Sequence, residues 1–326
     1  MDRIFYNLEC FLKQHITRKG FLKICLGGLL AFISSNTFLK FAFARSSTSD
    51  GRPKKNIKGK HDLVITEGPD PYKNTVKAVE AMGGMGKFVK KGDVVFLKAN
   101  ISWDRTPEQA GNTNPQVVAA LIDMCYKVGA KRVSMSDNTC NEARRCYDRS
   151  DIAKIAKEQG AHIHYVDNWD IVKAHFAYNS PMEDWPVYRE SVDCDVFINV
   201  PVLKHHSLTG LTLSMKNLMG ICSGVRGMMH AGIGRKLADL TDFIQPDLSI
   251  IDATRVLIRN GPSGGNLQDV VKMDKIVVGT DPVLTDAYAC TLVNRDPLSI
   301  SYIKEGNRLG YGSADLSGKD IVEVKT

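Results

Sequence analysis

The sequence predicts an α/β protein whose one main domain contains a parallel or mixed sheet with helices on both faces. Short runs of apolar, β-branched residues alternate along the chain with longer segments of helical periodicity. Such alternation is typical of a sheet covered by helices on both sides. Several of the strand-like runs, above all residues 195–203, are apolar at nearly every position, as strands buried on both faces are.

The predicted elements follow one another in a regular order. Strands are expected at 62–66, 93–99, 131–137, 162–167, 195–203, 247–252 and 275–280, and helices near 74–81, 115–129, 152–159 and 282–292. The second helix has the clearest signals, because Pro115 stands in its first turn, apolar residues form one stripe, and Gly129 follows its end. Residues 168–190 fit neither pattern and are predicted to be an insertion.

Residues 1–44 are predicted to be an export signal peptide. A basic segment runs to Lys19, an apolar run follows from Phe21 to Ile33, and Ala42-Phe43-Ala44 forms a cleavage site. The segment Thr17–Lys23 resembles the twin-arginine export motif with Lys19 in place of the second arginine, so this route and general secretion both stay open. The apolar run is shorter than the roughly 20 residues of a membrane-spanning helix, but an uncleaved anchor remains the alternative. We expect a periplasmic protein that meets the membrane only through this signal.

Residues 45–60 are predicted to form a flexible basic linker, because they are polar and show no apolar periodicity. The domain is then expected over residues 61–326. The net charge of +7 is concentrated in residues 1–60, and the rest of the chain is slightly acidic. Nucleic acid is therefore not an expected partner, since the domain has no broad basic face.

The cysteines after the predicted cleavage site contain no C-x-x-C motif, so zinc-ribbon, thioredoxin-like and ferredoxin-type motifs are absent from the sequence. Cys140 and Cys146 flank a polar loop. A disulfide between them and two free thiols are about equally compatible with the sequence, and metal ligation is less favoured.

Polar residues follow directly after most of the predicted strands. In open α/β sheets, ligands bind beyond the carboxyl ends of the strands, so these residues are the candidates for a functional site. They are Lys98, Asn100, Asp137, Asn138, Lys204, His205, His206, Asp252 and Asp281.

Residues 199–220 carry the densest group of candidates. Lys204 and Lys216 are expected to hold an anionic ligand together with Asn217, while His205 or His206 ligates a metal or transfers protons. The alternative is a pair of salt-bridged lysines with one packed and one exposed histidine. His230 follows a glycine-rich segment, which is either a lid or a plain surface loop.

Two further segments are candidates for ligand binding. Gly261, Gly264 and Gly265 lie in one loop whose backbone N–H groups are able to nest an anion, with a plain tight turn as the alternative. Asp281 is expected to cap a helix, whereas Asp286 is expected in the site. Together with Asp252, Asp286 would either ligate a metal ion beside His205 and His206 or pair with Lys216.

The string K-x-H-x-x-x-G-x-T-x-x-x-K-N-x-x-G, Lys204 to Gly220, resembles the prokaryotic family known as domain of unknown function 362, and the likeness extends from about residue 93 to the C-terminus. The resemblance implies an α/β fold, a twin-arginine signal in many members and fused ferredoxin-type iron–sulfur domains in others. It places the histidine of the string at His206 rather than His205. The chain has no ferredoxin motif, so an iron–sulfur cluster is implied only by kinship. The family's motif positions map onto Lys98, Asn100, Asp137, Lys204, His206, Lys216, Asn217, His230, Asp252, Gly261, Asp281 and Asp286.

Two functions follow from these observations. The first is an exported protein that binds a small anionic ligand, a metal ion or a redox cofactor, and acts as a redox-associated enzyme with His206, His230 and Lys216 as catalytic groups. A redox partner protein is then expected. The alternative is a non-catalytic binding or maturation factor for a metalloenzyme of the cell envelope. A serine hydrolase is not favoured, because the sequence contains no G-x-S-x-G motif.

Overall fold

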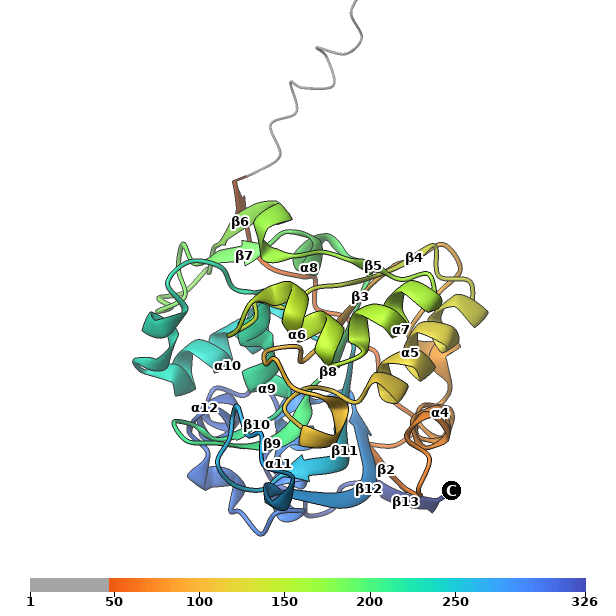
Figure 1. Ribbon diagram of the computed structural model, residues 1–326. Helices are drawn as coiled ribbons and strands as arrows, with labels where there is room; N and C mark the ends of the chain where they lie inside the picture. The colour runs from red at the N-terminus through yellow and green to blue at the C-terminus, as the bar shows by residue number, and fades with distance from the viewer. Residues whose placement is uncertain (1–46) are drawn as a thin grey trace, which may run out of the picture. The chain divides into compact units, whose positions relative to one another are not determined.

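The computed structural model describes residues 47–326, and the predicted export signal over residues 1–44 lies outside the described residues. The described chain forms a mixed sheet with helices on both faces, in one main domain, as the sequence predicts (Figure 1). None of the described helices combines the length and the apolar character that a membrane span requires.

The bounds of the elements place most strands and helices near their predicted positions. The strands are β1 (Thr48–Ser49), β2 (Leu63–Glu67), β3 (Val94–Ala99), β4 (Arg132–Met135), β5 (His162–Ile163), β6 (Ile171–Ala174), β7 (Pro186–Tyr188), β8 (Val196–Val200), β9 (Val202–His206), β10 (Gly210–Thr212), β11 (Leu248–Leu257), β12 (Val270–Gly279) and β13 (Ile321–Lys325). The α-helices are α4 (Pro71–Ala81), α5 (Pro115–Lys127), α6 (Ala143–Arg149), α7 (Ile152–Glu158), α8 (Glu190–Asp193), α9 (Ser214–Asn217), α10 (Ile233–Ile244), α11 (Pro282–Thr291) and α12 (Ser301–Arg308).

The main sheet has the strand order β13-β2-β12-β11-β8-β3-β4-β5. The pairs from β11 through β8, β3 and β4 to β5 are parallel, whereas β12 runs antiparallel to both of its neighbours. After Pro201 the chain leaves β8 and continues as β9, which pairs in parallel with the second half of β11 and antiparallel with β10. The carboxyl ends of β3, β4 and β8 therefore meet at one edge, next to β9.

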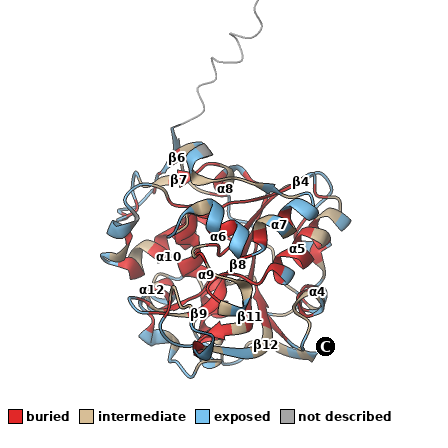
Figure 2. Ribbon diagram, viewed as in Figure 1, coloured by how far each residue is buried: buried red, intermediate tan, exposed pale blue. Residues whose placement is uncertain are grey.

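Two apolar cores lie on opposite faces of the sheet. Along β3, Val95 and Leu97 belong to the core under α4, α5 and α7, whereas Phe96 belongs to the core under α10 and α11. This alternation is what the two-residue repeat of a strand produces. The central strands β8 and β11 are buried, while the first half of β12 reaches the surface (Figure 2).

Residues 47–52 are docked against the domain, whereas the sequence predicts a flexible linker over residues 45–60. Strand β1 pairs with β6, so that β1, β6 and β7 form a small second sheet in which the predicted insertion takes part. Arg52 is 5% exposed and forms an ion pair with buried Asp247 at 2.6 Å. Its guanidinium also donates to the carbonyl oxygens of Ile244 and Asp195. The local composition indicates a solvated tether. It does not reveal the docking, because the partners of Arg52 lie about 140 to 195 residues away in the chain.

Candidate functional site

A small polar cavity of about 40 Å³ lies beyond the carboxyl ends of β3, β4 and β8. A volume of this size accommodates a few water-sized groups, such as a carboxylate or a small oxyanion. The cavity is lined by Asn100, Ser102, Trp103, Asp137, Cys140, Lys204, His206, Thr212, Lys216, Asn217, Met219, Gly220 and Pro262.

Lys204, in β9, is the cation buried most deeply in the cavity wall, with 1% of its surface exposed. Its Nζ donates to the side-chain oxygen of Asn100 at 3.1 Å and to the carbonyl oxygen of Gly111 at 2.5 Å. Both acceptors are neutral, and no described carboxylate forms an ion pair with Lys204. Burial lowers the pKa of Lys204 to about 7; ionised Cys140 and Asp137 oppose this shift, and the charges of Lys216 and Lys98 add to it.

Lys98, in β3, differs from Lys204 because it has a buried carboxylate partner. Its Nζ lies 2.9 Å from Oδ1 of Asp137, which follows β4, and both side chains are at most 1% exposed. The other oxygen of Asp137 accepts the backbone N–H of Ile101 at 2.6 Å. Gly220 approaches this pair so closely that a Cβ there would lie 1.8 Å from Asp137 Oδ1. The ion pair therefore joins β3 to β4, and it requires a glycine at position 220.

A chain of three asparagine amides connects Lys204 to α9. Asn100, which accepts from Lys204, donates to Asn217 at 3.0 Å, and Asn217 donates to Asn199 at 2.9 Å. Asn199 then donates to the carbonyl oxygen of Ser214 at 2.8 Å. These buried amides satisfy one another, so they fix the side chains of the cavity floor in one arrangement.

Lys216 enters the cavity from the four-residue helix α9, and its Nζ donates to the sulfur of Met219 at 3.1 Å. The first turn of α9 is held by Asp286 of α11, whose two oxygens accept the N–H groups of Ser214 and Met215. Burial raises the pKa of Asp286 to about 7. Asp286 therefore positions α9 through these two bonds. It does not line the cavity, although the sequence predicts it in the site.

His206 lines the cavity, and the centre of its ring lies 6.2 Å from that of His230. Burial, together with the charges of Lys216 and Lys204, lowers the pKa of His206 to about 3, so the imidazole is neutral at physiological pH. Its Nδ1 accepts the backbone N–H of Leu208 at 3.2 Å. The neutral ring therefore carries its proton on Nε2, where it is a hydrogen-bond donor.

The structure does not bring His205, His206, Asp252 and Asp286 together as the predicted metal site. Nδ1 of His205 accepts the backbone N–H of Gly261, and Asp252 accepts from Asn114 and Thr254. His205 and Asp252 thus accept structural hydrogen bonds from backbone N–H groups. Within residues 47–326, no group of three or more His, Cys, Asp or Glu side chains is arranged to hold a metal ion.

The described cysteines also do not fit an iron–sulfur cluster. Cys140 is exposed, whereas the others are buried, and burial raises the pKa of Cys125 and Cys194 to about 12. Cys140 and Cys146 are both unbridged. A cluster requires several thiolates facing one another, which these positions do not provide.

The glycines of the 259–266 loop have structural roles. A Cβ at Gly261 would lie 2.0 Å from the carbonyl oxygen of His205, so the backbone packs there without room for a side chain. Arg105 donates to the carbonyl oxygen of Gly264, and Gln109 donates to that of Gly265. None of the three glycines lines the cavity, although Pro262 between them does. The predicted anion nest is therefore not part of this site.

Several lining residues were not among the predicted site residues. Ser102 and Trp103 lie in the loop after β3, Thr212 ends β10, and Met219 follows α9. The sequence presents Cys140 as a disulfide partner, a free thiol or, less favoured, a metal ligand, and not as part of this cavity. Its position three residues after Asp137, beyond a predicted strand end, was the one signal that indicated a place in the site.

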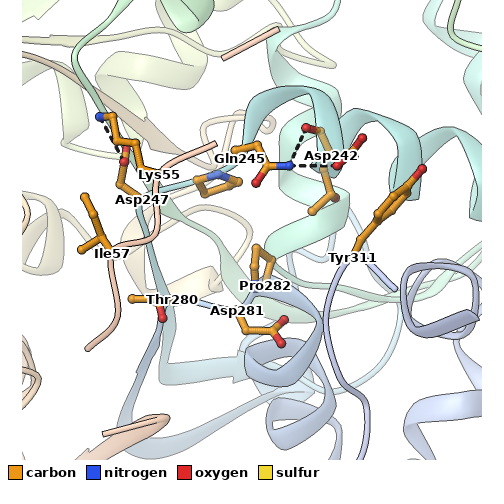
Figure 3. Close-up of a pocket in the computed structure, with 11 residues that line it drawn as sticks. Lys55, Ile57, Asp242, Gln245, Asp247, Thr280, Asp281, Pro282 and Tyr311 are labelled. Atoms are coloured by element: carbon orange, nitrogen blue, oxygen red, sulfur yellow. Dashed lines mark hydrogen bonds and ion pairs between the residues drawn. The ribbon is translucent and has the colours of Figure 1, made fainter. Parts of the chain in front are cut away.

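A larger cavity of about 210 Å³ lies elsewhere, between the 55–57 segment, the end of α10 and the start of α11 (Figure 3). Its carboxylates already have partners. Asp247 pairs with Lys55, Asp242 accepts from Gln245, and Asp281 caps α11 as predicted by accepting from Val283 and Leu284. It offers no unpaired charge comparable to Lys204, so the smaller cavity is the better candidate.

Comparisons with known proteins give one family and several partial matches. The model of the family "Domain of unknown function (DUF362)" matches residues 95–291, which include every residue that lines the small cavity. A thylakoid-associated protein of Synechocystis is 30% identical over 248 residues, covering 71% of this chain and 73% of that protein.

Two solved structures are more distant. A Thermotoga maritima protein matches with a TM-score of 0.39 and 12% identity, over 70% of this chain and 60% of its own. The lactate racemase apoprotein of Thermoanaerobacterium thermosaccharolyticum matches with a TM-score of 0.39 and 7% identity, over 74% of this chain and 58% of its own. This chain therefore spans less than two thirds of either solved chain.

Proposed function

Because the chain belongs to the family of domain of unknown function 362, and the family match includes every residue that lines the small cavity, we propose that the protein acts at this cavity. Its function there is to bind a small anionic group such as a carboxylate or an oxyanion. The observation that carries this proposal is Lys204, a buried lysine whose described partners are neutral.

A buried ammonium is costly unless an anion or a set of acceptors compensates it. Lys98 has such compensation in Asp137, but Lys204 has only two neutral oxygens. An anionic ligand would supply the missing charge and accept the third N–H of the Lys204 ammonium. Lys216 and the Nε2–H group of His206 are the further donors that the wall provides.

The same groups support acid–base chemistry on the bound anion. A lysine with a pKa of about 7 changes its protonation state near physiological pH, which is the property of an efficient general acid or base. Neutral His206 would donate a hydrogen bond from Nε2 without changing charge. We therefore propose that Lys204 is the proton-transferring group and that His206 orients the ligand.

Calorimetric titration with sulfate tests the proposal, because sulfate keeps its charge between pH 6 and 9. Binding is expected to weaken as the pH rises above about 7, since Lys204 then loses its proton. Lys204→Met and Lys216→Gln are each expected to weaken binding about tenfold to a hundredfold, the loss of one charge-assisted hydrogen bond.

Lys91→Gln is the matched control, because Lys91 is exposed and precedes β3 at the opposite end of that strand. Its affinity for sulfate should equal that of the wild type. Binding that all three substitutions leave unchanged would show that sulfate does not occupy this cavity, and the proposed function would be abandoned.

We further propose that the protein is exported and that its signal is removed after Ala44, on the basis of the A-x-A motif in the sequence. Mass spectrometry of the protein from the envelope fraction is expected to find Arg45 at the N-terminus. An intact Met1 in the membrane pellet would instead identify an anchor.

A further inference from the structure

Cys140 lies in the wall of the same cavity as Lys204, Lys216 and His206, and anion binding alone makes no use of it. Its backbone N–H donates to the carbonyl oxygen of Ser102 at 2.8 Å, which ties the loop after β4 to the loop after β3. The loop that bears the thiol is therefore fixed relative to β3 and β4 of the sheet.

This cysteine differs from the others that the structure describes. Cys140 is exposed, whereas Cys125, Cys146, Cys194, Cys222 and Cys290 are buried. Burial raises the pKa of Cys146 to about 11 and that of Cys125 to about 12, so these thiols stay protonated and inert. Among the described cysteines, Cys140 alone combines access to solvent with cationic neighbours.

We propose that Cys140 is the nucleophile of this cavity and that it reacts with small electrophiles bearing a carboxylate or another anionic group. The proposal rests on the anion-binding function: Lys204 and Lys216 hold the anionic group while the sulfur attacks the carbon attached to it. A substrate that lacks the anionic group would lose this orientation.

Lys204 is also placed to accept the proton of the thiol. It lines the same small cavity as Cys140, and burial lowers its pKa to about 7. In the reaction, the thiol proton first passes to the neutral amine of Lys204, and the resulting ammonium holds the anionic group. The sulfur then forms a bond to carbon, and the leaving group departs with the bonding electrons. With iodoacetate as probe, a C–S bond forms, the C–I bond breaks and iodide leaves.

Competing alkylation of the full-length protein tests this proposal. The rates at which iodoacetate and iodoacetamide label Cys140 are measured by mass spectrometry of its peptide, in the native and in the urea-denatured protein. The ratio of the iodoacetate rate to the iodoacetamide rate is expected to be about tenfold higher in the native state. The reason is that a neighbouring opposite charge favours a charged group by about tenfold or more in its equilibrium constant. Excess sulfate should slow the iodoacetate reaction.

The variants separate this inference from the proposed function. Lys204→Met and Lys216→Gln should bring the ratio back toward its denatured value, and Lys91→Gln should leave it high. A native ratio equal to the denatured ratio, in a protein that still binds sulfate, would overturn the role of Cys140 and leave anion binding intact. A high ratio that neither cavity lysine affects would overturn it as well.

Discussion

Replacing Gly220 with alanine would place a methyl group inside the Lys98–Asp137 ion pair. The new Cβ would lie 1.8 Å from Asp137 Oδ1 and 2.7 Å from Lys98 Nζ. Asp137 cannot move aside, because its other oxygen is bonded to the N–H of Ile101 at 2.6 Å. The methyl group therefore either separates two buried charges, which costs about 3–5 kcal/mol, or moves the backbone of residues 218–221. We expect the free energy of unfolding to fall by about 3–5 kcal/mol.

Urea denaturation, followed by circular dichroism, measures this loss, and Gly227→Ala is the matched control. A Cβ at Gly227 meets nothing within 4 Å, so its effect should stay within about 0.5 kcal/mol. Sulfate binding by the folded fraction of Gly220→Ala should also weaken, since Gly220 lines the cavity. Equal stabilities of the two alanine variants would refute the claim that the glycine exists to admit the ion pair.

Two further predictions concern groups outside the cavity. Burial raises the pKa of Asp286 to about 7, so the folded state retains a proton that the unfolded chain releases from about pH 4 upward. The unfolding free energy of the wild type minus that of Asp286→Asn should therefore decrease as the pH rises from about 4 to 7, and a constant difference in a denaturation series would contradict this. Arg52→Ala leaves buried Asp247 without its guanidinium and should cost about 3 kcal/mol in the same assay. Lys54→Ala, which removes an exposed pair with Asp242, should cost less than about 1 kcal/mol, and similar losses in the two variants would mean that residues 47–55 do not dock as described.

The fold was predictable because its main strands are buried on both faces. Apolar runs such as 195–203 identify buried strands without any knowledge of their neighbours. The sequence does not reveal that this run breaks at Pro201 into β8 and β9, because the break depends on β11 extending to Leu257 and pairing with both. Helix α10 was missed since its sequence begins within the glycine-rich segment.

The positions of Asn100, Asp137 and Lys204 followed from one rule, that polar residues after parallel strands meet at one edge. The rule fails for Asp252 and His205, which lie at the ends of predicted strands but inside β11 and β9 of the structure. It places a residue at the edge but does not say whether the side chain meets a ligand or a backbone N–H group. Asp252 accepts from nearby Thr254 and from Asn114, and the bond from Asn114 has no local signature in the sequence.

Asp286 shows why a carboxylate outside the cavity can still belong to the function. Helix α9 has only four residues and is too short to be stable by itself. Two N–H groups of its first turn, which have no partner within the helix, donate to the Asp286 oxygens. The helix carries both Lys216 and Asn217, and Asn217 continues through Asn100 to Lys204. A shift of α9 would therefore displace two of the cavity's donors at once. The family string joins Lys216 to Lys204 along the chain, but Asp286, which holds the helix of Lys216 in place, comes from α11. The sequence predicts Asp286 in the site itself, because no local pattern shows that its oxygens bind backbone N–H groups of α9.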